Sequence, residues 1–322
     1  MSTPANKKPF HTILCDLLGI EYPIIQGAIM HAGGPELVAA VSNAGGLGVL
    51  SSAGLSSDQL KQNIINTRRL TNKSFAINIQ AAALEFAQSR AKIAIEEGIV
   101  AVTLGRVDPK LPIIPLLKDR GIKVMAVVGN VKTAQRCQEQ EVDIIIASGL
   151  EAGGHIGRVA TMPLVPAVID AVRLPVVAAG GIADGRGFVA ALALGACGIQ
   201  MGTRFYATEE ANASFIEKNK IVSASEDDTL VSAALTGAAC RLIRETVLEQ
   251  WEEKKQSSAS PEELKNLSAD IQKKYWQKSD DTVVSAGQAS GIITSIMPAR
   301  EVIVSIVEEA QNICRRLSRL NK

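Results

Sequence analysis

The 322-residue sequence is poor in aromatic residues and histidine, and neither sign of charge is in excess. Its 34 basic side chains nearly balance 33 acidic ones, and no basic stripe with interleaved aromatics occurs, which argues against nucleic-acid binding. No apolar run is long enough to span a bilayer, and the first ten residues lack the apolar stretch of a signal peptide. These absences favour a globular protein whose partner is a small molecule, with no nucleic acid and no membrane.

Cysteine is scarce, and several motifs that carry chemistry are missing. The five cysteines are scattered without CxxC spacing, which indicates a reducing cytoplasm rather than a disulfide framework or a zinc site. With three histidines and no HxxxH or HxH spacing, no metal site is predicted. There is no GxSxG elbow and no P-loop, and Gly46-Leu47-Gly48 does not complete GxGxxG because Ser51 stands at the last position.

Short apolar runs alternate with helical patterns along most of the chain. Strands are predicted at Pro23–Gln26, Leu47–Leu50, Phe75–Asn78, Ile99–Thr103, Lys123–Val128, Asp143–Ala147, Pro175–Ala178 and Gly198–Met201. Helices are predicted at Pro35–Asn43, Ser57–Arg69, Leu84–Glu97, Pro112–Arg120, Val131–Gln140, Leu164–Val172 and Gly185–Leu194. The starts are spaced by one βα unit, so the eight strands are expected to close a TIM (β/α)8 barrel.

After residue 207 the pattern changes. Residues 208–281 are predicted to contain no strands and to form a helical subdomain inserted after strand 8, over the barrel mouth. Ser260-Pro261-Glu262-Glu263 predicts a helix start, with serine as the cap and glutamate at the capping-box position. Residues 1–207 and 282–322 form the barrel, which ends in an amphipathic helix begun by Pro298. A solvated helical decoration without functional contact is the alternative for the insertion.

Glycine pairs follow two of the predicted strands. Gly153-Gly154 lies beyond the sixth strand, and Gly180-Gly181 follows the seventh. Loops after the seventh and eighth strands of such barrels commonly bind phosphate, so Gly180, Gly181, Gly202 and Thr203 are expected to do so. The alternative is that these glycines only make tight turns.

His155 is the most plausible proton carrier. It lies among glycines just beyond a barrel strand, where an imidazole can act as a general base or as a hydrogen-bond donor. His31 follows the first strand and is expected to face the mouth as a substrate-binding residue. His11 precedes the barrel and is predicted to be structural.

Several motifs together resemble those of the nitronate monooxygenases, formerly called 2-nitropropane dioxygenases, and of their relatives, the flavin-dependent enoyl-ACP reductases. They occur in family order over nearly the whole chain: Gln26-Gly27, Ser42–Gly48, Asn78, Glu151–Gly157, Ala179–Gly185, Met201–Phe205 and Ser285–Gln288. The resemblance implies an FMN-binding TIM barrel. Its phosphate would lie on Gly180, Gly181, Gly202 and Thr203. The other cofactor-binding residues would be Gly27, Ala28, Asn78, Gly153, Gly154, Ser285 and Gln288, with His155 as the catalytic residue over the flavin.

Two reactions remain open within this resemblance. The first prediction is nitronate oxidation with O2 through a flavin semiquinone. The alternative is a flavin reductase that uses NAD(P)H to reduce an enoyl thioester or a quinone. Family reductases often carry tryptophan where this sequence has His31, so the aromatic wall over the flavin is expected to be missing.

A third hypothesis, from another class, is a non-catalytic barrel that binds FMN or another phosphate-bearing ligand. A homodimer through the outer helices is also left open, because no exposed stripe identifies an interface.

Overall fold

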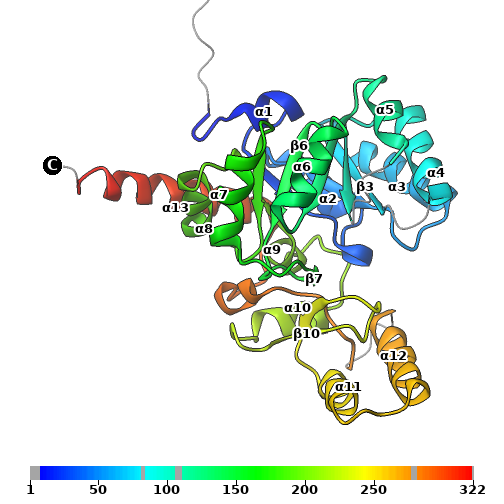
Figure 1. Ribbon diagram of the computed structural model, residues 1–322. Helices are drawn as coiled ribbons and strands as arrows, with labels where there is room; N and C mark the ends of the chain where they lie inside the picture. Colours follow the sequence, from blue (N-terminus) through cyan, green and yellow to red (C-terminus); the bar gives the residue numbers. More distant parts are fainter. Residues whose placement is uncertain (1–7, 81–83, 106–110, 277–280, 321–322) are drawn as a thin grey trace, which may run out of the picture.

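The centre of the molecule is a closed barrel of parallel strands (Figure 1). The computed structural model describes residues 8–80, 84–105, 111–276 and 281–320. In these ranges eight strands pair in the order β1-β9-β8-β6-β5-β4-β3-β2. A parallel bridge between Ile25 and Leu47 joins the two ends of the sheet, and the buried side chain of Gln26 accepts a hydrogen bond from the Val49 amide across the same join. The predicted TIM barrel is confirmed.

All eight predicted strands are present, each within two residues of its predicted ends. The barrel strands are β1 (Ile24–Gln26), β2 (Gly48–Ser51), β3 (Phe75–Gln80), β4 (Ala101–Gly105), β5 (Lys123–Val128), β6 (Ile144–Ser148), β8 (Val176–Ala179) and β9 (Gly198–Met201). The short strand β7 (Gly154–His155) lies between β6 and β8 in the sequence but does not pair with the barrel strands. The seventh and eighth strands of the barrel are therefore β8 and β9.

Helices separate these strands and cover the outside of the barrel (Figure 1). They are α1 (Ile13–Leu18), α2 (Pro35–Asn43), α3 (Ser57–Leu70), α4 (Leu84–Glu96), α5 (Ile113–Lys118), α6 (Val131–Glu139), α7 (Thr161–Ala171), α8 (Gly185–Ala193), α9 (Thr203–Tyr206) and α13 (Ala299–Leu317). Helix α7 begins three residues before its predicted start at Leu164. Its first turn is stabilised by a residue outside the helix, because the Glu151 carboxylate accepts a hydrogen bond from the Thr161 amide at 3.0 Å.

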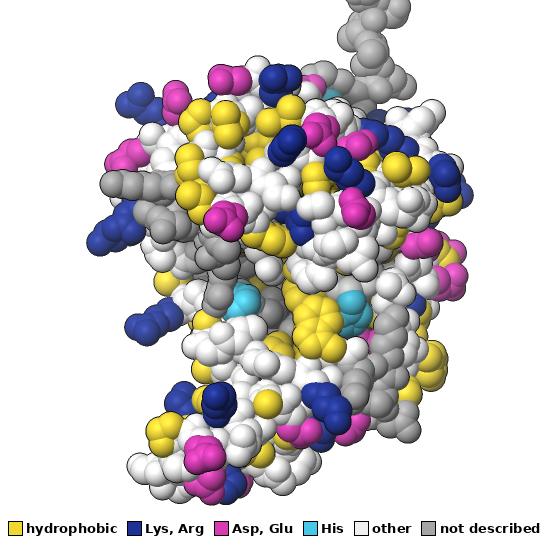
Figure 2. All heavy atoms as spheres, turned by 90° about the vertical axis from the view of Figure 1, so that its right-hand side faces the viewer, with side chains coloured by type: hydrophobic (Ala, Val, Ile, Leu, Met, Phe, Trp, Pro, Cys, Tyr) yellow, Lys and Arg dark blue, Asp and Glu magenta, His cyan; other side chains and the backbone are white. Residues whose placement is uncertain are grey.

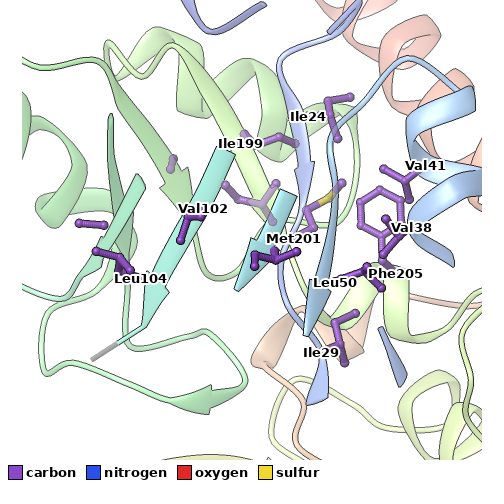
Figure 3. Packing of buried hydrophobic residues seen from close by; sticks show 14 of the residues in the cluster. Ile24, Ile29, Val38, Val41, Leu50, Val102, Leu104, Ile199, Met201 and Phe205 are labelled. Carbon is purple, nitrogen blue, oxygen red and sulfur yellow. The ribbon is translucent and has the colours of Figure 1, made fainter. Parts of the chain in front are cut away.

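The strands divide their side chains between two buried layers. Residues such as Ile25, Val49 and Ile146 point into the barrel, whose amino-terminal end is plugged by Leu14 and Leu18 of α1. The alternate positions pack outward against the helices (Figure 3). The outward positions labelled there include Ile24, Leu50, Val102 and Ile199, which share one cluster with Val38 and Val41 of α2 and with Phe205 of α9. Burial on both faces explains why the strands read as continuous apolar runs.

The segment after α9, here called the insert, lies across the carboxyl ends of the barrel strands (Figure 1). It comprises α10 (Phe215–Val222), β10 (Thr229–Ser232), β11 (Cys240–Ile243), α11 (Thr246–Gln256) and α12 (Pro261–Trp276). The predicted capping box is confirmed, since Ser260 Oγ accepts from the Glu263 amide at 3.2 Å and the Ser260 amide donates to the Glu263 carboxylate at 3.1 Å.

The prediction that residues 208–281 contain no strands is wrong. Strands β10 and β11 form an antiparallel hairpin, and β7 pairs with β11 to complete a three-stranded sheet. Each strand of the hairpin has only four residues, too few to show a convincing alternation of apolar and polar positions. The hairpin is anchored by contact with β7, some 80 residues away in sequence, which no local pattern reveals.

Candidate functional site

A cavity of about 680 Å³ lies between the carboxyl ends of the barrel strands and the insert. Figure 2 shows the hollow between the two parts, with histidine side chains on either side of apolar ones. Its barrel side is lined by strand ends and glycine loops, and its insert side by the loop of the β10–β11 hairpin and by α12. Among the described residues that line it there is neither lysine nor arginine, and Glu151 is the one carboxylate.

The loops after β8 and β9 present free backbone amides to the cavity. Gly180 (φ +95°) and Gly181 (φ +72°) adopt left-handed conformations that favour glycine, and a Cβ on Gly180 would meet Thr161 Oγ1 at 2.9 Å. Within the described ranges the amides of Gly180, Gly181 and Gly202 donate to no protein acceptor. A Cβ on Gly202 would meet nothing within 4 Å. Such amides and such open space suit an anion like a phosphate.

The neighbouring helix does not supply this cradle. The first turn of α8 is already capped by Asp184, whose carboxylate accepts from the amides of Arg186 and Gly187 at 2.9 and 3.1 Å. A phosphate would therefore rest on the loop amides rather than on the α8 N-terminus.

A loop from the C-terminal part of the chain completes this side of the cavity. Thr203 Oγ1 accepts from the Gly287 amide at 2.9 Å, which leaves the hydroxyl hydrogen of Thr203 free to donate to a ligand. Gly153 packs so closely on the same loop that a Cβ there would lie 2.7 Å from the backbone of Ala286. Ser285 lines the cavity. Gln288 does not line the cavity, and its backbone amide donates to the Glu151 carbonyl at 2.9 Å.

The predicted flavin-ring residues come together at the ends of β1 and β3. Gly27, Ala28 and Asn78 line the cavity, and the Asn78 side-chain amide donates to Thr103 Oγ1 at 3.0 Å. This bond fixes the Asn78 side chain between β3 and β4. Gly154 (φ +72°) lines the opposite side, with open space where a Cβ would be.

His155 is exposed to the cavity at the seam between barrel and insert. It lies on β7, where its backbone is paired with Cys240 of β11. Its ring Nε2 lies 2.8 Å from Thr236 Oγ1. The imidazole is thus held at the cavity surface, with the glycine loops on one side and the insert on the other.

His31 is held by polar contacts between the barrel and the insert. It falls on η1 (Met30–Ala32), is not among the residues lining the cavity, and places Nε2 2.7 Å from Glu217 Oε1 and 3.2 Å from the Tyr206 hydroxyl. Burial would raise the pKa of the Glu217 carboxyl, but hydrogen bonds from His31, the Ser214 amide and Tyr206 outweigh it and lower that pKa to about 2. Glu217 is therefore an ionised carboxylate, 1% exposed, that ties the insert to the barrel.

Comparison with known proteins now identifies the fold's relatives. The nitronate monooxygenase family model matches residues 11–309. The chain belongs to the nitronate monooxygenase family.

Named relatives of this family member differ in their reactions. It is 39% identical over 241 residues to a hydroxy-methyl-oxo-octahydro-indene-carboxyl-CoA dehydrogenase of Rhodococcus jostii, which covers 75% of this chain and 68% of that one. It is 32% identical to a probable nitronate monooxygenase of Staphylococcus saprophyticus, over 95% of this chain and 99% of the relative. The structure of FabK from Thermotoga maritima superposes with a TM-score of 0.90 at 37% identity, over 96% and 99% of the two chains.

This membership makes the chain an oxidoreductase that depends on a flavin. The glycine loops fit the phosphate of such a cofactor by their free amides and open space, as described above. In the described part of the chain, no group of three or more metal-ligating side chains gathers. No helix in that part is long and apolar enough to cross a membrane.

Aromatic side chains do line the cavity of this family member. Tyr275 and Trp276 at the end of α12 line the cavity together with Tyr206. His31 occupies the position expected for tryptophan, and its ring packs against Tyr275 and Trp276 with centroids 5.9 and 6.2 Å apart. The aromatic surface therefore comes from the insert, about 245 residues later in the sequence, and His31 packs against it. Burial raises the pKa of Tyr275 to about 12, so its hydroxyl stays protonated.

Glu151 and Thr161 were not singled out from the sequence. Glu151 lines the cavity, and its carboxylate accepts from the amide and the hydroxyl of Thr161 at 3.0 and 2.9 Å. The same Thr161 hydroxyl lies 3.0 Å from the carbonyl of Gly180, so the pair packs directly against the phosphate loop. Glu151 stood inside a quoted motif, yet a carboxylate that caps a helix ten residues away leaves no local signal.

Proposed function

We propose that this protein is an FMN-dependent reductase that takes reducing equivalents from NAD(P)H and delivers them to an α,β-unsaturated acyl thioester. The observation that carries this choice is the charge of the cavity. Among the described lining residues, no lysine or arginine is available to pair with an anionic nitronate. The insert side offers Leu235, Ala238 and Ala239, which suit an apolar acyl chain.

Two relatives support the same substrate class. The carboxyl-CoA dehydrogenase at 39% identity acts on a CoA thioester by its name, and FabK is an enoyl-ACP reductase. FMN would be held through its phosphate by Gly180, Gly181, Gly202 and Thr203, with its ring against Gly27, Ala28 and Asn78. When bound, the flavin supplies hydride transfer in both half-reactions.

The chain's own residues supply position and a proton. His155 is proposed to donate a hydrogen bond or a proton to the substrate once hydride has reached its β-carbon. The aromatic rings of Tyr206, Tyr275 and Trp276 line the cavity and would help to exclude water from it.

Nitronate oxidation, the first prediction from the sequence, is the second candidate function. The match of the family model over residues 11–309 and the 32% identity to a probable nitronate monooxygenase favour it. His155 would then orient the anion or remove the α-proton of a neutral nitroalkane.

The reductive half-reaction separates the two candidates. The visible spectrum of the flavin-loaded protein is followed without oxygen while NADH, NADPH or propyl-2-nitronate is added. Rapid bleaching by a nicotinamide, with no change on adding nitronate, is the expected result. A flavin that is reduced by nitronate and stays oxidised with both nicotinamides would replace the proposal with nitronate oxidation.

A further inference from the structure

The hairpin loop of the insert carries a hydroxyl that reaches the ring of His155. Thr236, in the loop between β10 and β11, places Oγ1 2.8 Å from His155 Nε2. The same hydroxyl lies 3.5 Å from the Ala238 carbonyl, a long distance for a hydrogen bond between oxygens, and 3.5 Å from Cys240 Sγ. The contact with His155 is the shortest of the three.

The loop that presents Thr236 is held in place from several directions. Leu235 is 7% exposed and packs in the core of the insert, and its carbonyl accepts from the Gln272 side chain at 3.0 Å. Gly237 adopts φ +77°, and its amide donates to the Ala233 carbonyl at 2.8 Å, which closes the turn. A hydroxyl on so constrained a loop has a defined position, as a positioning group requires.

The other end of the hairpin is tied to the barrel loop that carries His155. Arg241 on β11 donates from Nε to the Leu150 carbonyl at 3.0 Å and from Nη1 to Thr229 Oγ1 at 2.8 Å. The Ile156 amide donates to the Ala239 carbonyl at 3.2 Å, one residue beyond His155. The backbone of His155 and the side chain that touches its ring are thus fixed to the same hairpin.

We propose that Thr236 is a positioning residue for His155. Its hydroxyl holds Nε2 and so fixes one orientation of the imidazole at the cavity surface. This role rests on the proposed function in one respect, because it takes His155 to be the catalytic residue. The insert would then orient the residue that transfers the proton, in addition to covering the barrel mouth.

Three variants test this role. Thr236→Val keeps the shape of the side chain and removes the hydroxyl, Thr236→Ser restores the hydroxyl, and Thr236→Ala repeats the removal in a smaller side chain. Thr236 is exposed, so none of these changes empties a buried core position. Thr246→Val is the matched control, because Thr246 is an exposed insert residue at the start of α11.

The first readout does not depend on activity. The chain has three histidines, so the ring nitrogens of His155 can be assigned in NMR spectra of the FMN-loaded protein by comparison with His155→Ala. Thr236→Val and Thr236→Ala are expected to change the ring chemical shifts and the pH titration of His155 alone, and Thr236→Ser is expected to restore both. A His155 signature that is unchanged in both hydroxyl-free variants would overturn the proposal.

The second readout is turnover. Loss of the hydroxyl is expected to lower kcat roughly 10- to 100-fold and to shift the pH profile, with KM nearly unchanged, because the proton donor His155 is misaligned rather than lost. Thr236→Ser and Thr246→Val should remain within about threefold of the parent. Wild-type kcat in Thr236→Val would also overturn the proposal. If neither thioester nor nitronate is turned over, the proposed function fails, and the NMR signature still decides the role of Thr236.

Discussion

The two sides of the cavity differ in how they are built. The barrel side consists of glycine loops with free amides, held by rigid strand ends and by the Glu151–Thr161 pair. The insert side consists of apolar and aromatic side chains on a hairpin and a helix that have a small core of their own. A surface of backbone amides suits the invariant phosphate of a cofactor, whereas a surface of side chains can vary with the substrate. The difference suggests that the barrel binds the flavin and the insert selects the second substrate.

The largest effect on cofactor binding is expected on the barrel side, at Gly202. A Cβ there meets nothing within 4 Å, so Gly202→Val should fold normally and fill the space of the phosphate. FMN affinity should fall about 100-fold, which corresponds to roughly 3 kcal/mol of binding free energy. Flavin fluorescence on titration with FMN measures this, and the melting temperature of the flavin-free protein serves as the control. Full occupancy at the parent's affinity would place the phosphate elsewhere.

His155→Ala is expected to separate catalysis from cofactor binding. Turnover should fall by roughly 10²–10⁴ because a general acid or base is lost, while the flavin spectrum stays unchanged. His11→Ala is the matched control, since His11 pairs with the exposed Asp16 before the barrel begins. A loss of less than about threefold in His155→Ala would show that its role is misassigned.

The seam between the two sides is expected to depend on Glu217. Because the folded pKa of about 2 lies below the ordinary 4.5, the carboxylate contributes stability above pH 4.5, and this contribution is lost as the pH falls toward 2. Glu217→Gln should therefore lower the free energy of unfolding at pH 7 by roughly 3 kcal/mol and flatten the acid limb of the stability curve. Urea unfolding at pH 7 and pH 3 measures both effects.

The control for this seam is Glu96→Gln. Glu96 pairs with Lys61 at 2.9 Å on the surface, and such pairs contribute little. Equal losses in the two variants would mean that Glu217 is no more important than a surface charge.

The smallest effect is expected on the insert side, at Trp276. Its ring lines the cavity and is 53% exposed, so it is available to pack on a substrate. Trp276→Ala should raise KM for an enoyl thioester about tenfold and leave FMN affinity unchanged, in line with about 1.4 kcal/mol for an aromatic contact. A similar loss of FMN affinity in Trp276→Ala would show that the insert side does not bind the second substrate alone.

The sequence predicts the barrel far better than the insert. Most barrel strands carry an apolar run next to a glycine, and α1, α3, α6 and α8 begin with a side-chain cap, so local signals agree with the fold. The β10–β11 hairpin was missed because its two four-residue strands depend on pairing with β7.

The same contrast holds for the site. His155 and the glycines could be found because motif and position along the strand coincide. Residues whose role depends on tertiary contact could not, as Thr236, Tyr275 and Glu217 show. No local pattern predicts that the His31 ring pairs with Glu217, on a helix that begins almost 200 residues later.

The oxidative half-reaction tests most directly whether the insert side accepts a thioester. Flavin-loaded protein is reduced without oxygen by the preferred nicotinamide and mixed in a stopped-flow instrument with a short trans-2-enoyl-CoA. The account predicts that the flavin absorbance returns within the turnover time and that one saturated thioester forms per flavin. A flavin that stays reduced with the enoyl-CoA and is reoxidised only by oxygen would contradict it.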